Sequence, residues 1–227
     1  MDFTPPRMPP LDLTLSGRTV RLEPMNIHHA VDLEAEFRAH DDLWDYMPSG
    51  PFADLGAFET WIDSRAGKPD PLFLTILDRA TNRALGVASF MRIDVPNGVI
   101  EVGGIAFSPA LQGTVMATEA MVLMMKWAFE AGYRRYEWKC NALNLPSRRA
   151  AQRLGFSYEG LFRQHMILKG RNSDTAWFSI LDAEWPALKA TFDMWMSDDN
   201  FDSQGQQKRP LSRLTAPLLK ARDPALN

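Results

Sequence analysis

Residues 111–120 read Leu-Gln-Gly-Thr-Val-Met-Ala-Thr-Glu-Ala and join a strand-like run to a long apolar helix. Gly113 suits a turn, and Thr114 is a favourable N-cap for the helix that follows. The N–H groups of a first helical turn have no acceptor within the helix, and the helix dipole adds partial positive charge there. Such a corner can bind phosphate without a basic side chain. Two interpretations stay open: an anion-binding corner, or a simple strand-to-helix turn.

The composition is that of an ordinary globular protein. Of the 227 residues, 45% are hydrophobic and 23% are charged, which is typical of such domains. The net charge of −3 gives no bulk attraction to nucleic acid or to an anionic membrane, so neither partner is expected. Cys140 is the only cysteine, which excludes an intramolecular disulfide. The proline-rich start lacks the apolar segment of a signal peptide, so we expect a cytoplasmic protein.

The chain is expected to comprise a lead-in at residues 1–16, one domain at 17–196 and a tail at 197–227. Apolar spacing and turn residues predict the elements of the domain. They are a strand at 19–23, helices at 28–40 and 54–66, a strand meander at 72–77, 84–93 and 99–107, a helix at 114–131, a strand at 133–140, a helix at 144–154, strands at 156–166 and 175–181 around a turn at 169–172, and a helix at 185–196. This order predicts an α/β domain with a mixed, mostly antiparallel sheet covered by helices on both faces.

Two local features refine this picture. Gly103 and Gly104 weaken the strand at 99–107 and predict a bulge or a close approach to the backbone. In the helix at 114–131, the charged residues Glu119, Lys126 and Glu130 fall on the side opposite the apolar stripe.

Two short motifs occur in order with one strand between them. In the first, Gln112 and Ala117 fit the pattern Gln/Arg-x-x-Gly-x-Gly/Ala, and Val115 stands at the central glycine. In the second, Asn144 and Ser147 fit Asn-x-x-Ser, followed by Gly155-Phe156. Together they resemble the GCN5-related N-acetyltransferase (GNAT) superfamily, especially its RimJ/RimL-like branch. The resemblance implies the GNAT fold, whose fourth and fifth strands, at 99–107 and 133–140, splay apart around the acyl-pantetheine arm.

The resemblance also implies an activity, a cofactor and a set of contacts. The activity is transfer of an acetyl group from acetyl-CoA (coenzyme A) to a primary amine, either a protein N-terminus or a small amine. Relatives often form homodimers. The alternative is a non-catalytic acyl-CoA-binding or interaction module that keeps the fold. The implied cofactor-binding residues are Ile105, Phe107, Gln112, Gly113, Thr114, Val115, Met116, Ala117, Thr118, Asn144, Ser147 and Arg149, with no metal.

The chemistry needs a donor to the thioester carbonyl, a base for the amine and an acid for the leaving thiolate. The bulge near Gly103 and Gly104 is the candidate donor, and Ser147 is the candidate acid. Glu101 is the first candidate base, although a strand-surface carboxylate is its ordinary role. His165 is the second, because histidine titrates near neutrality, and Glu23 is a weaker option. Met166 stands where the RimL-like branch has a carboxylate.

Aromatic and acidic residues between the first two helices are candidates for the amine-acceptor pocket. The alternative is a set of core aromatics beside a solvated acidic loop, which we favour for Trp61 and leave open for Trp44 and Tyr46. The group comprises Trp44, Tyr46, Phe52 and Trp61 with Asp41, Asp42 and Asp45. Four basic residues, Arg148, Arg149, Lys169 and Arg171, are candidate phosphate contacts or surface charges.

Overall fold

The computed structural model describes residues 4–226 and divides the chain into two compact units, residues 1–132 and 133–227. Both units combine antiparallel strands with helices, as the sequence predicts. The first unit holds β1 (Leu15–Ser16), β2 (Val20–Pro24), η1 (Ile27–His29), α1 (Ala30–Phe37), η2 (Asp41–Trp44), α2 (Leu55–Arg65), β3 (Leu72–Asp78), β4 (Ala84–Asp94), β5 (Val99–Phe107) and α3 (Val115–Glu130). The second holds β6 (Arg135–Asn141), α4 (Leu145–Arg153), β7 (Ser157–Leu168), β8 (Arg171–Leu181), α5 (Trp185–Trp195), η3 (Asp198–Asn200), α6 (Leu211–Thr215), η4 (Ala216–Leu218) and η5 (Pro224–Leu226).

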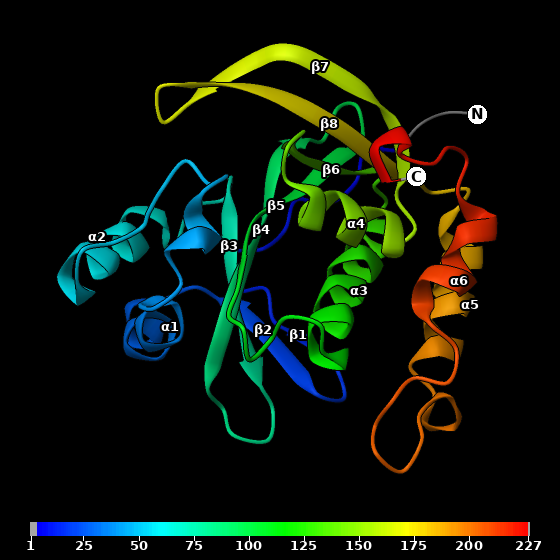
Figure 1. Ribbon diagram of the computed structural model, residues 1–227, viewed down its shortest axis with the longest axis horizontal. Helices are drawn as coiled ribbons and strands as arrows, with labels where there is room; N and C mark the ends of the chain where they lie inside the picture. Colours follow the sequence, from blue (N-terminus) through cyan, green and yellow to red (C-terminus); the bar gives the residue numbers. More distant parts are fainter. Residues whose placement is uncertain (1–3, 227) are drawn as a thin grey trace. The chain divides into compact units, whose positions relative to one another are not determined.

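In the first unit, β1 to β5 pair antiparallel in sequence order. Helices α1 and α2 lie on one face of these strands and α3 lies on the other (Figure 1). The strands β3 and β4 are buried along most of their length, because both of their faces are covered. The predicted meander is confirmed, and its third strand has the predicted bounds.

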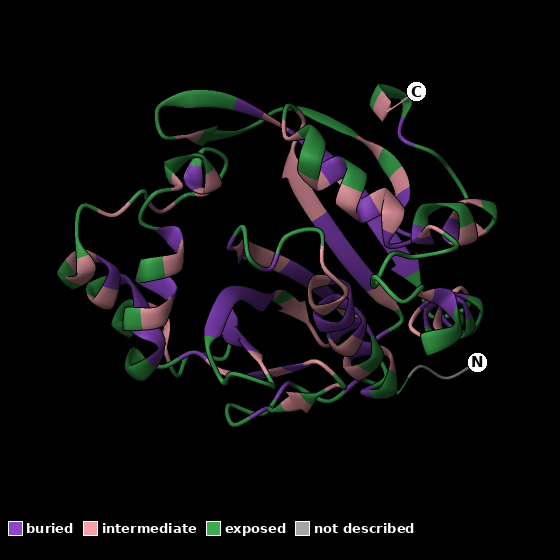
Figure 2. Cartoon of the chain, turned by 60° about the horizontal axis from the view of Figure 1, so that its bottom comes forward, coloured by how far each residue is buried: buried purple, intermediate pink, exposed green. Residues whose placement is uncertain are grey.

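In the second unit, β8 lies between β6 and β7, and both pairs are antiparallel. Strand β8 begins at Arg171, earlier than predicted, because the hairpin turn needs only Lys169 and Gly170. Both residues have positive φ, 47° and 74°, which is the geometry of a two-residue turn that follows the twist of the strands. Most of β7 is exposed (Figure 2). No helix within residues 4–226 has the length and hydropathy needed to cross a membrane.

Glu119 is buried, contrary to its predicted place on the polar side of the helix at 114–131. Its carboxylate accepts hydrogen bonds from the backbone N–H groups of Arg18 (2.5 Å) and Thr19 (2.7 Å) and from the Thr19 hydroxyl (2.5 Å). A Cβ at Gly17 would lie 2.6 Å from the same carboxylate, so a larger residue there would displace Glu119. The carboxylate of α3 therefore holds the turn between β1 and β2.

We expect Glu119→Ala to lower the free energy of unfolding by on the order of 3 kcal/mol, because buried donors lose a charged acceptor. Glu130→Ala on the same helix is the control. Glu130 is more than half exposed and forms only an i,i+4 pair with Lys126, so its loss should cost less than about 0.5 kcal/mol. Urea unfolding measures both, and equal losses would contradict the anchoring role.

His29 is a buried histidine at the start of α1, only 4% exposed. Its Nδ1 accepts the N–H of Asn26 at 3.2 Å, so the ring proton lies on Nε2, which faces Glu23 Oε1 at 3.0 Å. Burial lowers the pKa of His29, and the hydrogen bond to Glu23 opposes that shift. The folded protein therefore holds a neutral histidine at neutral pH.

A buried neutral histidine makes stability depend on pH. Below the ordinary histidine pKa of about 6.5, the unfolded chain binds a proton that the folded chain does not, so stability falls as pH falls towards the lowered folded pKa. Urea unfolding between about pH 7 and about pH 5 should show this decline, and His29→Gln should flatten it. Glu23 also has a lowered pKa, despite a burial effect that raises it, because His29 and Arg21 favour its charged form. The pH range in which Glu23 changes stability lies lower than that of His29, because carboxylates titrate at about pH 4. An unchanged slope in His29→Gln would contradict the assignment.

Candidate functional site

The predicted bulge in the strand at 99–107 is confirmed. Ser89 pairs with Gly103 and Val87 with Ala106, so β5 carries one more residue than β4 between these two pairs. Gly104 has a φ of +59°, and a Cβ there would lie 2.8 Å from the Phe73 ring. The Ser89 hydroxyl donates to the Gly103 carbonyl at 2.9 Å. Glycine is therefore required at this bend by both backbone conformation and space.

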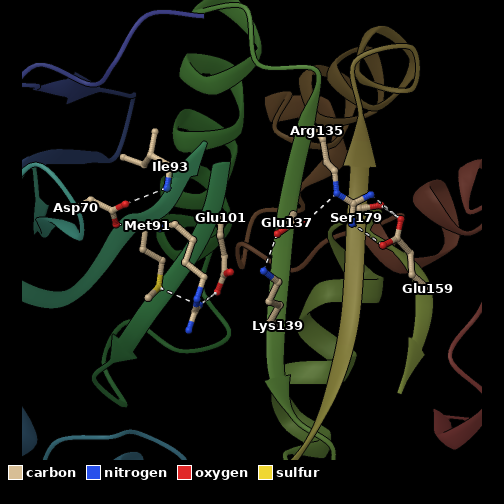
Figure 3. Close-up of polar contacts among 10 residues, drawn as sticks. Asp70, Met91, Ile93, Glu101, Arg135, Glu137, Lys139, Glu159 and Ser179 are labelled. Carbon is tan, nitrogen blue, oxygen red and sulfur yellow. Dashed lines mark hydrogen bonds and ion pairs between the residues drawn. The ribbon is translucent and has the colours of Figure 1, made fainter. Parts of the chain in front are cut away.

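Glu101 lies two residues before the bulge and is buried on β5. Its Oε1 accepts a hydrogen bond from Arg92 Nη1 at 2.6 Å, beside Met91 on the neighbouring strand (Figure 3). Arg92 sits in a second bulge, with a φ of 48°. Asp70 holds that bulge by accepting the N–H groups of Arg92 and Ile93 at 2.9 and 3.0 Å. Glu101 is therefore a buried ion-pair partner and not a surface carboxylate.

The corner before α3 has both the glycine turn and the threonine N-cap that the sequence suggests. Gly113 makes the turn with a φ of +72°. The Thr114 hydroxyl caps the helix and donates in turn to the Leu111 carbonyl at 2.6 Å. Three N–H groups of this corner are bonded within the protein: Gln112 to the Ser108 carbonyl (2.9 Å), Thr114 to the Leu111 carbonyl (3.3 Å) and Ala117 to the Thr114 hydroxyl (3.1 Å).

Three N–H groups at the same corner stay available. Those of Gly113, Val115 and Met116 have no acceptor among residues 4–226. Gly113 is exposed, and Val115 and Met116 are half-buried, so an external anion can reach them. These donors at the positive end of a 16-residue helix fit a phosphate group.

Val115 does not oppose this arrangement. It is the first residue of α3, and the left-handed conformation belongs to Gly113 two residues earlier. A β-branched residue is compatible with the helical conformation. The side chain of Gln112 turns back and donates to the Phe107 carbonyl at 2.8 Å, which ties the corner to the end of β5. Ile105 and Phe107 are half-buried on that strand.

In the second unit, Asn144 is the N-cap of α4. Its Oδ1 accepts the Ser147 N–H at 3.1 Å, which is the ordinary role of an asparagine at the start of a helix. Pro146 lies in the first turn, where a missing N–H costs nothing. The turn from Asn141 to Asn144 is itself closed by a backbone hydrogen bond of 2.9 Å.

Ser147 lies in the first turn of α4 and is half-buried. Its Oγ accepts a hydrogen bond from Trp138 Nε1 at 3.0 Å. Cys140 lies nearby on β6, where burial raises the pKa of its thiol to about 11 and the Ser147 hydroxyl partly offsets the rise. A protonated thiol is a poor nucleophile. Because the indole donates to its oxygen, the Ser147 hydroxyl keeps its own proton, for which the Cys140 sulfur is a neighbouring acceptor.

Arg148 is not a phosphate contact, because it is buried and forms a bidentate pair with Asp223. The sequence offers no pattern that links these two residues across 75 positions. Arg149, the next residue, is exposed and remains a candidate for a phosphate. Trp138 and Asp223 are the neighbours of the Asn144–Ser147 turn that sequence reasoning missed.

His165 lies on the exposed part of β7, with its Nδ1 2.9 Å from the Thr175 hydroxyl. Its ring contacts Phe162 edge-on at 5.5 Å and Trp177 at 6.0 Å. Met166 is 41% exposed beside it. His165 therefore belongs to an aromatic cluster on the β7–β8 hairpin.

The charged face of β6 forms an ion network, as its alternation of charged residues suggests (Figure 3). Arg135 pairs with Glu137 at 2.6 Å and bidentately with Glu159, and Lys139 pairs with Glu137 at 2.7 Å. The Glu159 carboxylate, which also accepts the Ser179 hydroxyl, has a pKa lowered first by Arg135. Glu137 and Glu159 are therefore bound up in the ion network of this strand.

The aromatic group near the first two helices is mainly core. Trp44 and Trp61 are 2% and 8% exposed and pack edge-on at 5.9 Å, which resolves the question left open for Trp44. A hollow of about 610 Å³ adjoins them in the first unit. Its lining combines charged and apolar residues: Glu34, Arg38, Asp41, Pro51, Phe52, Ala53, Asp54 and Leu55.

Glu23, His28 and His29 form the one group among residues 4–226 whose ligand atoms lie close enough to share a metal ion. The surroundings do not suit one. The Asn26 N–H keeps Nδ1 of His29 deprotonated, so Nε2 must carry the proton. Arg21 donates to the other Glu23 oxygen at 2.8 Å and places a cation beside the group. The cluster fits an ion-paired helix cap.

Known proteins share this chain's sequence and fold. A GNAT acetyltransferase domain model matches residues 19–157. The crystal structure of a GCN5-related N-acetyltransferase from Brucella melitensis is 46% identical, with a TM-score of 0.90, and the match covers 94% of this chain and 98% of that one. A probable GNAT-family acetyltransferase from Chromobacterium violaceum is 39% identical over 82% of this chain and 93% of its own, with a TM-score of 0.77. An uncharacterized N-acetyltransferase p20 from Bacillus licheniformis is 28% identical over 76% of this chain and 98% of its own length. The predicted GNAT fold is thereby confirmed, and the chain belongs to the GNAT family of acetyltransferases.

Proposed function

We propose that the protein is an acetyl-CoA-dependent N-acetyltransferase of the RimJ/RimL-like type, which acetylates a primary amine by direct attack. The observation that carries the proposal is the set of N–H groups of Gly113, Val115 and Met116, which have no acceptor among residues 4–226. They occur in the loop where the family motif places the cofactor diphosphate. No basic side chain is required, because backbone donors and the dipole of α3 supply the positive potential.

The residues of each unit fit coenzyme A chemistry. The corner before α3 would hold the diphosphate, and Arg149 would add a cation for a phosphate. Asn144 and Ser147 would meet the pantetheine arm. Bound acetyl-CoA supplies an activated thioester, and the chain has only to orient it, polarise its carbonyl and manage two protons. The backbone at Gly104 and Ile105, which have no paired residue on β4, is our candidate for polarisation.

The proton steps are assigned to Ser147 and Glu101. The Ser147 hydroxyl would donate to the departing sulfur, with its own oxygen oriented by Trp138. Glu101 would remove a proton from the substrate ammonium group, because alkylamines are protonated at neutral pH and only the neutral amine can attack the thioester carbonyl. Arg92 Nη1 contacts Glu101 Oε1 at 2.6 Å and holds the carboxylate in place on β5. His165 is the alternative base. The kcat values of Glu101→Gln and His165→Asn decide between the two, because the variant with the larger loss identifies the base.

The acceptor is a primary amine, either a protein N-terminus or a small molecule. The hollow beside Phe52 presents the carboxylates of Glu34, Asp41 and Asp54, which would attract a cationic amine. Arg38 pairs with Glu34 and lowers its pKa, so that carboxylate stays charged.

A thiol-release assay with acetyl-CoA and a panel of amines and N-terminal peptides tests the function. Turnover of any acceptor supports the proposal. Stabilisation by coenzyme A without turnover supports a non-catalytic acyl-CoA-binding module instead. Absence of both signals at high coenzyme concentration would overturn both cofactor assignments.

We expect Gly113→Val to weaken coenzyme A binding by at least about tenfold, because a β-branched residue resists positive φ and shifts the N–H groups. Gly170→Val is a matched control. Gly170 has a similar φ of +74°, and neither glycine has an atom within 4 Å of an added Cβ. Calorimetric titration with coenzyme A measures both variants, and equal affinities would remove the corner from the binding site.

Ser147→Ala should lower kcat by on the order of tenfold while changing acetyl-CoA affinity less, because the hydroxyl acts on the leaving group. The variant also leaves Trp138 Nε1 without its acceptor, so a lower melting temperature is expected. Ser157→Ala, which removes a buried hydroxyl that accepts the Lys220 N–H at 2.9 Å, controls for the loss of an acceptor. An unaltered kcat in Ser147→Ala would show that water or no acid serves the sulfur.

A further inference from the structure

The last part of the chain folds against α4 and the start of β7 within the second unit. Three hydrogen bonds fix it there: the Tyr158 N–H to the Ala221 carbonyl (3.1 Å), the Lys220 N–H to the Ser157 hydroxyl (2.9 Å) and the Thr215 hydroxyl to the Arg153 carbonyl (3.0 Å). This places Asp223 beside the first turn of α4.

Asp223 is fully buried, and both of its carboxylate oxygens accept hydrogen bonds from the guanidinium of Arg148. Arg148 Nε donates to Oδ2 at 2.6 Å and Nη2 to Oδ1 at 2.5 Å. Asp223 is itself held, because its N–H donates to Gln152 Oε1 at 2.8 Å and its Oδ1 accepts the Ala225 N–H at 3.0 Å. The pair therefore has a single defined geometry.

The remaining end of the same guanidinium reaches the turn that carries the second motif. Arg148 Nη1 donates to the Ala142 carbonyl at 2.7 Å. Ala142 lies two residues before Asn144, which caps α4 and bonds the Ser147 N–H. Because a guanidinium is a rigid planar fork, fixing one edge with Asp223 fixes where Nη1 can hold Ala142.

We propose that Asp223 is a positioning residue for the cofactor site: it orients Arg148, which anchors the Ala142 carbonyl and thereby sets Asn144 and Ser147. This inference rests on the proposed role of Asn144 and Ser147 towards acetyl-CoA. Asp223 acts through Arg148 and does not itself touch the cofactor. The segment around Asp223 thereby has a role in the proposed cofactor site.

The test separates positioning from stability with four variants, of which Asp223→Glu tests recovery of activity. Asp223→Asn keeps the shape but leaves the Arg148 charge buried without its carboxylate, so it is expected to be unstable. The double variant Arg148→Met/Asp223→Leu removes both charges and relieves that penalty, yet it leaves Ala142 without its anchor. Thr215→Val is the control, because it loosens the same terminal segment at the opposite end of α4.

We expect the double variant to lower kcat/KM for acetyl-CoA roughly ten- to hundredfold, as displaced contact groups do. Its melting temperature should stay near or above that of Asp223→Asn. Thr215→Val should lose stability with kcat/KM unchanged. Asp223→Glu, which restores a carboxylate, should recover part of the activity. Wild-type kcat/KM in a folded double variant would overturn the proposal.

Hydrogen exchange gives a readout that does not need activity. The Ser147 N–H is held by Asn144 Oδ1 at 3.1 Å in the turn that Arg148 anchors. In folded Asp223→Asn that turn should loosen, so exchange of the Ser147 N–H should accelerate several-fold, and in Thr215→Val it should not. If the wild-type protein binds no coenzyme A, the proposed function fails on its own. An unchanged exchange rate of Ser147 in folded Asp223→Asn would then reject the link from Asp223 to this turn.

Discussion

The capture of the β1–β2 turn by Glu119 is the contact on which the first unit depends. A carboxylate on α3 satisfies two backbone N–H groups and a hydroxyl that belong to residues a hundred positions earlier. The contact fixes α3 on its face of the strands, and the direction of α3 decides where its N-terminus points. The available N–H groups of Gly113, Val115 and Met116 are useful to an anion only if that direction is fixed. Burial of a charged group is thus tied to the geometry of the proposed phosphate site.

The second unit uses a buried charge in a comparable way. Arg148 and Asp223 compensate each other, and the remaining guanidinium edge holds the turn before α4. In both units a long-range contact of a buried ionisable side chain orients the start of a helix whose first turn carries a family motif. The side chains of the motifs serve local structure as well: Thr114 and Asn144 are N-caps. Capping and ligand binding are compatible, because a cap satisfies one N–H and leaves its neighbours available.

The catalytic assignments follow from the partners of each candidate. Glu101 is the first candidate base, with a paired strand-surface carboxylate as the alternative, and the structure buries it against Arg92. Ser147 receives an indole N–H, so its oxygen is oriented and the hydroxyl keeps its own proton. His165 lies among aromatic rings on an exposed hairpin. The charged residues of β6 pair with one another, and Glu101 and His165 are the bases to compare.

The sequence by itself determined the order of the elements, the glycine bulge, the corner before α3 and the two motifs, because each depends on residues close together in the chain. Apolar periodicity, turn glycines and capping side chains act locally, so their effects can be predicted without a fold. Only the tertiary structure decided that Glu119 is buried, that Arg148 forms an ion pair with Asp223 and that Trp138 orients Ser147. Those contacts join residues that no local pattern relates. Their energies come from burial, which exists only once the chain has folded.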